Sequence, residues 1–187
     1  MINVAVFASG EGTNAENLFK YFANDPRVKI KVVITNRNNS GVIARAEKYR
    51  KNVHIVSKAA MENYTGQLIE FLKVEKIDLI VLAGFLLKIP DQFIKAFPNR
   101  IINIHPALLP KHGGKGMYGM NVHKAVLESG DTESGITIHY VDGHYDSGDV
   151  ILQARCPIEP GETPESLSAK VRALEFEYLP KAIERFA

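Results

Sequence analysis

The sequence predicts an α/β protein with a mostly parallel central sheet and helices on both faces. Short runs rich in valine and isoleucine alternate along the chain with amphipathic stretches, which is typical of a parallel sheet connected by helices. The run Leu79–Ala83 is apolar at every position, as expected for a strand that is covered on both faces. Two strand-like segments late in the chain are close in sequence, so we expect that pair to be antiparallel.

In the first half of the chain, runs of β-branched and apolar residues alternate with segments whose apolar residues recur at helical spacing. The expected strands cover residues 2–7, 28–35, 53–56 and 79–83, and the expected helices cover residues 14–22, 42–50 and 61–74.

In the second half, strands are expected at residues 101–104, 135–141 and 150–156, and a helix at 122–129. Thr163, Pro164 and Glu165 supply an N-cap, a first-turn proline and a first-turn acid, which indicate a last helix that runs to about Phe186. We find no repeat or linker, and therefore expect one domain over residues 1–187.

The composition restricts the class of protein. The formal charge of +2 comes from scattered lysines and arginines without a basic stripe, which argues against a nucleic-acid partner. Cys156 is the only cysteine, so a disulfide framework is excluded and a reducing compartment fits. No signal-peptide pattern opens the chain and no apolar run reaches the ~20 residues of a membrane span. We expect a soluble, cytoplasmic protein without a membrane partner.

The turn after the first strand contains Gly10, Gly12, Thr13 and Asn14, and a helix is expected to follow at once. Such a turn can bind phosphate, because glycines let the backbone approach an anion and the helix N-terminus favours negative charge. The spacing is neither that of a P-loop nor the full dinucleotide-binding pattern. The alternative is a tight turn in which Thr13 or Asn14 caps the helix.

The pair Asn103 and His105 is more informative, because it lies at the C-terminal end of a buried strand, where ligands of open α/β sheets gather. Residues two apart on a strand point to the same side, so we expect these side chains to converge. An amide donor and a histidine suit acyl transfer. Alternatively, His105 only caps the strand before Pro106, and Asn103 bonds a neighbouring turn. The histidines have none of the tight ligand spacings, so we predict no metal, with zinc as the less favoured alternative.

An acidic, glycine-rich loop over residues 142–149 connects the two late strands. One interpretation is a flexible turn. The other is that one of its carboxylates approaches His105 and raises the pKa of the imidazole.

At this point the residues resemble a known family. The string Asn103–Pro110, followed by Asp146, resembles the signature of the 10-formyltetrahydrofolate-dependent formyltransferases. The turn Gly12–Asn14, the segment Ala83–Phe85 and the compact length are most similar to members that act on 5-phosphoribosylglycinamide in purine biosynthesis. The resemblance covers nearly the whole chain and implies a Rossmann-like formyltransferase fold.

The resemblance also implies a reaction and its site. The formyl group would pass from 10-formyltetrahydrofolate, as co-substrate, to the amine of 5-phosphoribosylglycinamide (glycinamide ribonucleotide) by direct attack, without a metal. Asn103, His105 and Asp146 would stabilise the tetrahedral intermediate. The resemblance assigns Gly12, Thr13, Asn14 and Glu175 to the ribonucleotide, and Leu86, Leu87, Lys88, Ile89, Asn103 and Val141 to the folate.

Some positions depart from the family pattern. Leu87 stands where many relatives have arginine, and Lys58 and Lys88 are the candidates for a basic contact to the folate tail. The glycine-rich loop Lys111–Met120 is longer than in many relatives and is a candidate for a mobile lid.

Two other functions stay open at this stage. One is another folate-dependent enzyme, either a formyltransferase for methionyl-tRNA or an amino sugar, or a formyltetrahydrofolate hydrolase. The other is a non-enzymatic nucleotide-binding module with structural histidines. For the oligomeric state we expect a monomer or a weak homodimer.

Overall fold

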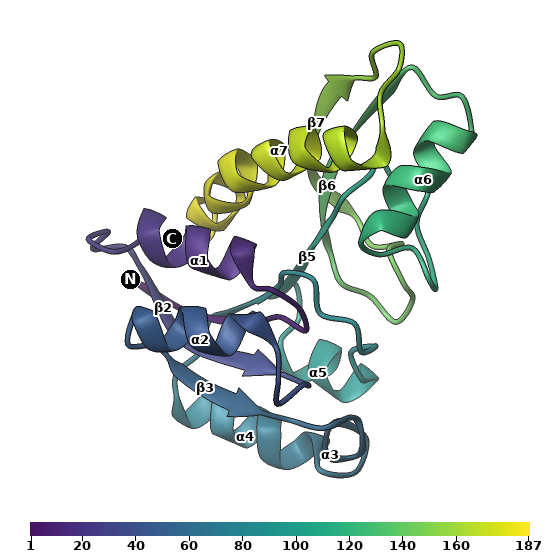
Figure 1. Cartoon of the computed structure of the whole chain (residues 1–187). Coiled ribbons are helices and arrows are strands. Elements are labelled where there is room, and N and C mark those ends of the chain that lie inside the picture. Colours follow the sequence, from purple (N-terminus) through teal and green to yellow (C-terminus); the bar gives the residue numbers. More distant parts are fainter. The chain divides into compact units, whose positions relative to one another are not determined.

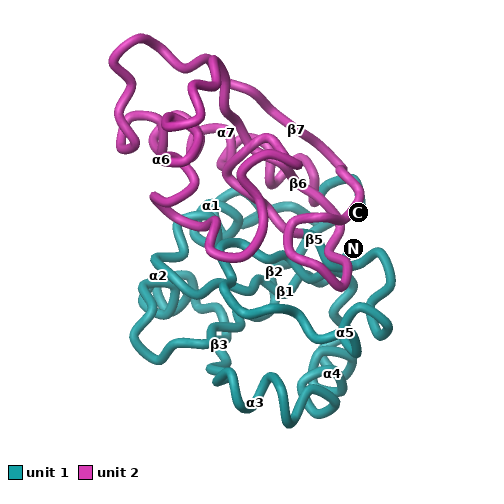
Figure 2. The backbone as a smooth tube through the Cα atoms, turned by 90° about the vertical axis from the view of Figure 1, so that its right-hand side faces the viewer, with its two compact units in different colours: residues 1–102, 184–187 teal, residues 103–183 magenta.

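Two compact units make up the chain in the computed structural model, which describes all residues from 1 to 187 (Figure 2). Unit 1 comprises residues 1–102 and 184–187, and unit 2 comprises residues 103–183. The single domain expected over residues 1–187 stays a prediction.

Unit 1 contains a parallel sheet, in which the strands lie in the order β3-β2-β1-β4-β5. In register, β1 pairs with β2 from Ile2 opposite Val28 to Phe7 opposite Ile34, with an irregularity after Val4. The bounds of these strands are β1 (Ile2–Phe7), β2 (Val28–Thr35), β3 (Asn52–Ile55), β4 (Leu79–Leu82) and β5 (Ile101–His105), the last of which continues into unit 2.

Helices cover both faces of the unit 1 sheet (Figure 1). Helices α1 and α2 pack together on one face, while α3, α4 and α5 lie on the other. Their bounds are α1 (Thr13–Tyr21), α2 (Gly41–Lys48), α3 (Lys58–Asn63), α4 (Thr65–Val74) and α5 (Asp91–Ala96).

The core of unit 1 forms around the apolar strands that the sequence indicates. Residues Val4 to Ala8 and Leu79 to Val81 are fully buried, as expected for parallel strands covered on both faces. Phe7 contacts Phe85 and Phe93 edge to face, with ring centroids 5.3 and 6.2 Å apart. This packing fixes the C-terminal end of β1, from which the glycine turn begins.

Unit 2 starts with the last three residues of β5, beside the hairpin of β6 (Glu133–Tyr140) and β7 (Val150–Pro157), with α6 (Met120–Glu128) and α7 (Pro164–Glu184). The pairing of β6 with β7 is antiparallel, from Glu133 opposite Pro157 to His139 opposite Val150. A side chain at Gly135 would place its Cβ 1.9 Å from the carbonyl oxygen of Ala154, so the hairpin requires glycine there.

The α/β prediction is confirmed, with its mostly parallel strands and its antiparallel pair late in the chain. The N-cap of α7 is also confirmed, because Thr163 Oγ1 accepts a hydrogen bond from the Ser166 N–H at 3.2 Å. The single helix expected over residues 61–74 is wrong: Tyr64, at φ −123°, separates α3 from α4, and α3 begins earlier, where Ser57 caps it. Helix α5 was not predicted, because six residues are too few to show a helical period.

Candidate active site

Two polar side chains end strand β5. Asn103 is half-buried and His105 is 3% exposed, while Ile104 between them is 5% exposed. Because alternate strand residues point to the same side, Asn103 and His105 share one side of β5.

Asp146 lies between these two side chains. Its Oδ1 accepts a hydrogen bond from Asn103 Nδ2 at 3.2 Å and lies 3.6 Å from His105 Nδ1. Its Oδ2 accepts a hydrogen bond from the backbone N–H of Gly114 at 2.9 Å. The structure therefore brings Asn103, His105 and Asp146 together within unit 2, and we call these three residues the polar cluster.

The loop that carries Asp146 has its own set of contacts. Asp142 accepts hydrogen bonds from the His144 N–H and the Ser147 hydroxyl at 2.8 and 2.9 Å. A Cβ at Gly148 would lie 1.9 Å from the carbonyl oxygen of Tyr140, so only glycine fits there. Asp146 itself has a φ of 51°, in the left-handed region. These contacts define the turn that directs Asp146 toward β5.

The protonation of His105 follows from its hydrogen-bond partner. Its Nε2 lies 2.8 Å from the backbone carbonyl oxygen of His112, which can only accept, so Nε2 carries a hydrogen. Nδ1, on the side of Asp146, is then the atom that gains or loses a proton. Burial lowers the pKa of His105 below its ordinary value, although Asp146 and the His112 carbonyl act in the opposite direction.

The expected carboxylate therefore does act to raise the pKa of His105, but the net shift of that pKa is downward. The carboxylate is present, and its attraction favours the imidazolium. However, the cost of burying a charge on a side chain that is 3% exposed is larger. In the ligand-free protein His105 is mainly uncharged at neutral pH.

Asp146 is ionised. Burial alone would raise its pKa, but His139, His105 and the Gly114 N–H outweigh that effect, and the pKa lies below its ordinary value. A charged carboxylate thus faces an uncharged imidazole, which makes Nδ1 of His105 a place where an incoming proton is stabilised.

His139, on β6, is a member of the site that the sequence did not single out. Its Nδ1 donates to the Tyr140 carbonyl oxygen at 2.8 Å, so its Nε2 can accept the hydrogen bond from Asn103 Nδ2 at 3.1 Å. Both N–H groups of the Asn103 amide are thereby engaged, one with His139 and one with Asp146. His139 is 2% exposed. The only available signal was its presence on a strand ahead of the acidic loop.

The glycine turn of unit 1 differs from the polar cluster, because its shape is set by backbone conformation and not by side-chain contacts. Gly12 has a φ of 74°, and a Cβ there would lie 2.5 Å from the Cβ of Val42. Gly12 is itself the N-cap of α1, without a side-chain cap, so the alternative in which Thr13 or Asn14 caps the helix is wrong. Thr13 and Asn14 form the first turn of α1, at the end that favours anions.

The segment Leu86–Ile89 follows β4 in unit 1 and has no regular secondary structure. The N–H of Leu86 donates to Ser9 Oγ at 2.9 Å, and Ser9 Oγ in turn donates to Asn36 Oδ1 at 2.5 Å. Leu87 is half-buried, Lys88 is exposed and Ile89 is 3% exposed. Two further predicted binding residues, Val141 and Glu175, are half-buried and belong to unit 2.

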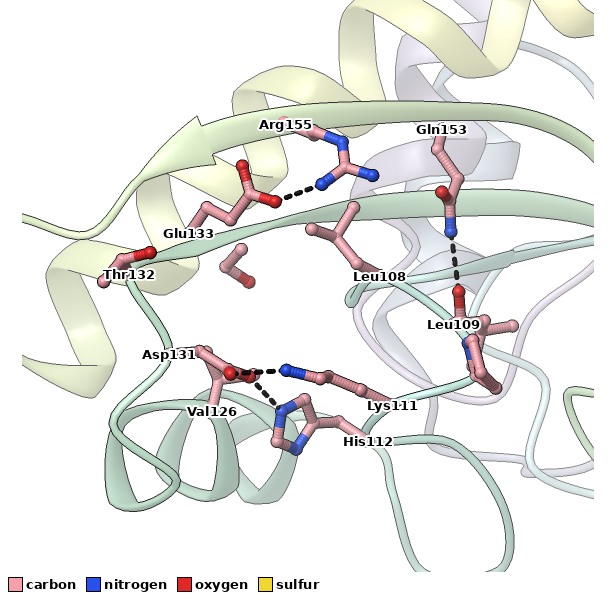
Figure 3. Close-up of a pocket in the computed structure, with 12 residues that line it drawn as sticks. Leu108, Leu109, Lys111, His112, Val126, Asp131, Thr132, Glu133, Gln153 and Arg155 are labelled. Carbon is pink, nitrogen blue, oxygen red and sulfur yellow. Dashed lines mark hydrogen bonds and ion pairs between the residues drawn. The ribbon is translucent and has the colours of Figure 1, made fainter.

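A surface cavity of about 330 Å³ is lined by unit 2 residues on both sides of the β6 N-terminus (Figure 3). Its charged side chains are paired with one another: Lys111 and His112 with Asp131, and Arg155 with Glu133. None of the polar cluster residues lines it, although His112, whose carbonyl binds His105, does.

Two further features concern metal binding and membrane insertion. The side chains form no group of three or more His, Cys, Asp or Glu that could hold a metal ion. No helix combines the length and the apolar character that crossing a bilayer requires.

Residues 2–183 match the formyl transferase family. The chain belongs to this family. The family resemblance inferred from Asn103–Pro110 and Asp146 is thereby confirmed.

Two relatives illustrate the similarity to curated proteins. A chloroplastic phosphoribosylglycinamide formyltransferase of Arabidopsis thaliana is 41% identical over 174 residues, which cover 90% of this chain and 59% of the relative. A phosphoribosylglycinamide formyltransferase of Haemophilus influenzae is 34% identical, over 100% of this chain and 87% of the relative. The chain thus spans less than two-thirds of the plant protein and most of the bacterial one.

Solved structures agree with the fold. The phosphoribosylglycinamide formyltransferase of Coxiella burnetii, solved in complex with CHES, superposes with a TM-score of 0.90 at 34% identity. The comparison covers 100% of this chain and 87% of that one. The predicted formyltransferase fold is confirmed.

Proposed function

We propose that this family member transfers a formyl group from 10-formyltetrahydrofolate to the amine of 5-phosphoribosylglycinamide, a reaction of purine biosynthesis. Relatives at 34% and 41% identity carry the name of that activity. The observation that carries the proposal is the convergence of Asn103 and His105 on Asp146, at 3.2 and 3.6 Å.

The reaction begins when the amine nitrogen attacks the formyl carbon, which places negative charge on the formyl oxygen and positive charge on the amine. His105 starts uncharged, so its Nδ1 can take the proton that the amine loses, directly or through a water ordered by Asp146. The imidazolium is then stabilised by the Asp146 carboxylate beside it. His105 returns the proton to the folate nitrogen as the carbon–nitrogen bond to the folate breaks.

The negative oxygen needs a hydrogen-bond donor, and Asn103 supplies it in this proposal. Because both of its N–H groups are engaged, Asn103 must release one partner on substrate binding. We expect the contact with Asp146 to be the one exchanged, because Asp146 has a second hydrogen-bond donor. Asp146 then retains the Gly114 N–H as a partner.

Binding of the two substrates uses the groups that the family resemblance implies. The turn Gly12–Asn14 binds the ribose phosphate through its N–H groups and the N-terminus of α1. Glu175 binds the glycinamide moiety, and residues 86–89, Asn103 and Val141 bind the folate. Because the Leu86 N–H is held by Ser9, the carbonyl groups of residues 86–89 and the N–H groups of residues 87–89 are the ones we assign to the pterin ring.

We also infer the setting in which this reaction runs. The reaction requires no metal, and the protein acts in the cytoplasm as a monomer or weak homodimer on small-molecule substrates. Among the alternatives, a formyltetrahydrofolate hydrolase would use the same cluster with water in place of the amine, but the glycine turn would then have no ligand.

A turnover assay tests the proposal. Purified protein is mixed with 10-formyltetrahydrofolate and 5-phosphoribosylglycinamide in the presence of EDTA, and the formylated nucleotide is identified by mass spectrometry. We expect one formylated nucleotide for each tetrahydrofolate released. Release of formate that does not depend on the amine would indicate the hydrolase, and absence of turnover with retained nucleotide binding would indicate a binding module. Either result would contradict the proposal.

A further inference from the structure

The segment Lys111–Gly114, which opens the glycine-rich loop, binds two members of the polar cluster with its backbone. The carbonyl oxygen of His112 accepts the hydrogen bond from His105 Nε2 at 2.8 Å. The N–H of Gly114 donates to Asp146 Oδ2 at 2.9 Å. One short stretch of backbone therefore orients both the imidazole and the carboxylate.

The backbone conformation that permits both bonds is an unusual one. His112 has a φ of 55°, in the left-handed region, which costs a residue other than glycine about 1–2 kcal/mol. At Gly113, a Cβ would lie 2.5 Å from Leu109 Cδ2 and 3.2 Å from the Cβ of Asp146. The segment thus lies directly against Asp146 in a conformation that needs support from elsewhere.

Asp131, in the turn between α6 and β6, provides that support (Figure 3). Its Oδ2 is 2.8 Å from His112 Nε2, and its Oδ1 is 2.7 Å from Lys111 Nζ. The His112 and Asp131 side chains are 14% and 19% exposed, so the contact is shielded from solvent far more than a usual surface pair. The hydrogen bond from His112, followed by that from Lys111, lowers the pKa of Asp131 to about 2, which keeps the carboxylate ionised.

We propose that Asp131 is a positioning residue of the active site, which holds His112 in the left-handed conformation so that the Lys111–Gly114 segment fixes the orientations of His105 and Asp146. The inference rests on the proposed function for its effect on catalysis. With the His112 carbonyl in place, Nε2 of His105 keeps its hydrogen and Nδ1 is the proton-transfer atom. Without Asp131, the segment samples other backbone conformations and His105 loses its fixed tautomer.

A double-mutant cycle between Asp131 and His112 tests the mechanism. Asp131→Asn should lower kcat about tenfold while both KM values stay within about twofold, because the orientation of His105 is lost and substrate binding is not. Asparagine adopts the left-handed region more readily than histidine, because its short polar side chain can hydrogen-bond locally, so the backbone of His112→Asn should depend less on Asp131. In the His112→Asn background, Asp131→Asn should therefore cost less than about twofold in kcat.

Glu133→Gln is the matched control. Glu133 lines the same cavity and its carboxylate pairs with Arg155, but no contact joins this pair to the Lys111–Gly114 segment. Its kcat should equal that of the wild type. The inference is wrong if Asp131→Asn leaves kcat unchanged, or if it lowers kcat equally with and without His112.

A spectroscopic measurement separates this inference from the proposed function. In ¹⁵N-edited NMR of the imidazoles, wild-type His105 should show hydrogen on Nε2, and Asp131→Asn should shift the His105 signals toward a mixture of tautomers. This result is expected even if the protein fails to formylate 5-phosphoribosylglycinamide. In that case the proposed function would be wrong, and the positioning role of Asp131 would still be supported. Unchanged His105 signals in Asp131→Asn would overturn the positioning role while leaving the function intact.

Discussion

The glycine turn of unit 1 and the polar cluster of unit 2 are built on opposite principles. At Gly12 the proposed functional groups belong to the backbone, and the positive φ and the close contact with Val42 leave no room for a side chain. At Asp146 they are side chains, whose charges are set by burial and by one another. The difference teaches that substitutions in the first region should act through backbone shape, and in the second through proton position.

The largest effect is expected in the polar cluster, at His105, the residue proposed to transfer the proton. His105→Ala should lower kcat about 10³-fold, the range typical of losing a general acid or base. Steady-state kinetics would measure the loss, and circular dichroism would check that the fold is retained. His144→Ala is the matched control, because that imidazole is 86% exposed in the neighbouring loop and should leave kcat unchanged. A retained kcat in His105→Ala would remove the proposed proton acceptor.

Asp146→Asn should have the next largest effect, a fall in kcat of about 10²-fold. The substitution also tests the electrostatics. The Asp146 carboxylate stabilises the imidazolium and so raises the pKa of His105, while burial lowers it by more. Without the carboxylate charge, nothing from residue 146 offsets the effect of burial. The pKa of His105 should therefore fall further below its ordinary value. An NMR titration of His105 measures this, and a pKa that rises in Asp146→Asn would contradict the assignment of causes.

Substitutions in the glycine turn should act only by changing the shape of its backbone. Gly12→Ala forces a Cβ to within 2.6 Å of the Val42 Cα at a positive φ, and should destabilise the fold by about 1–3 kcal/mol. It should also raise KM for the ribonucleotide more than it lowers kcat. Gly10→Ala, where a Cβ meets nothing within 4 Å, is the control in the same turn. Urea unfolding and steady-state kinetics would measure the stability and the KM of both variants. Equal values for Gly12→Ala and Gly10→Ala would contradict the role given to Gly12.

The smallest effect is expected at His139, whose proposed role is to hold the Asn103 amide by a hydrogen bond. Glutamine can place an amide oxygen near the position of the imidazole Nε2, whereas asparagine reaches only the position of Nδ1. His139→Gln should therefore keep kcat within about threefold, and His139→Asn should lose about tenfold. If both variants lose the same amount, the hydrogen bond from Asn103 at 3.1 Å is not what His139 contributes.

The sequence predicted much of the fold because its signals are local. Apolar runs such as Leu79–Leu82 identified the parallel strands, and Thr163 identified the start of α7. The break at Tyr64 and the six-residue helix α5 escaped, since neither leaves a periodic pattern long enough to recognise.

For the candidate site, the sequence indicated which side chains lie together, but it did not reveal the contacts that support them from distant segments. Strand alternation placed Asn103 and His105 on one side, and the family motif supplied Asp146. By contrast, the pairing of His112 with Asp131 joins residues 19 positions apart, and no sequence pattern predicts a contact over that separation. The net pKa shift of His105 depends on how completely its side chain is buried, which only the packed structure reveals.

The central claim is that His105 and Asp146 work as one proton-transfer unit, and the double variant His105→Ala/Asp146→Asn tests it most directly. Its kcat for formyl transfer, measured beside both single variants, should be no lower than that of His105→Ala alone. If Asp146 acts only through His105, its loss has no further effect once the imidazole is absent. A double variant whose loss is the product of the two single losses, about 10⁵-fold, would show that the two residues act independently.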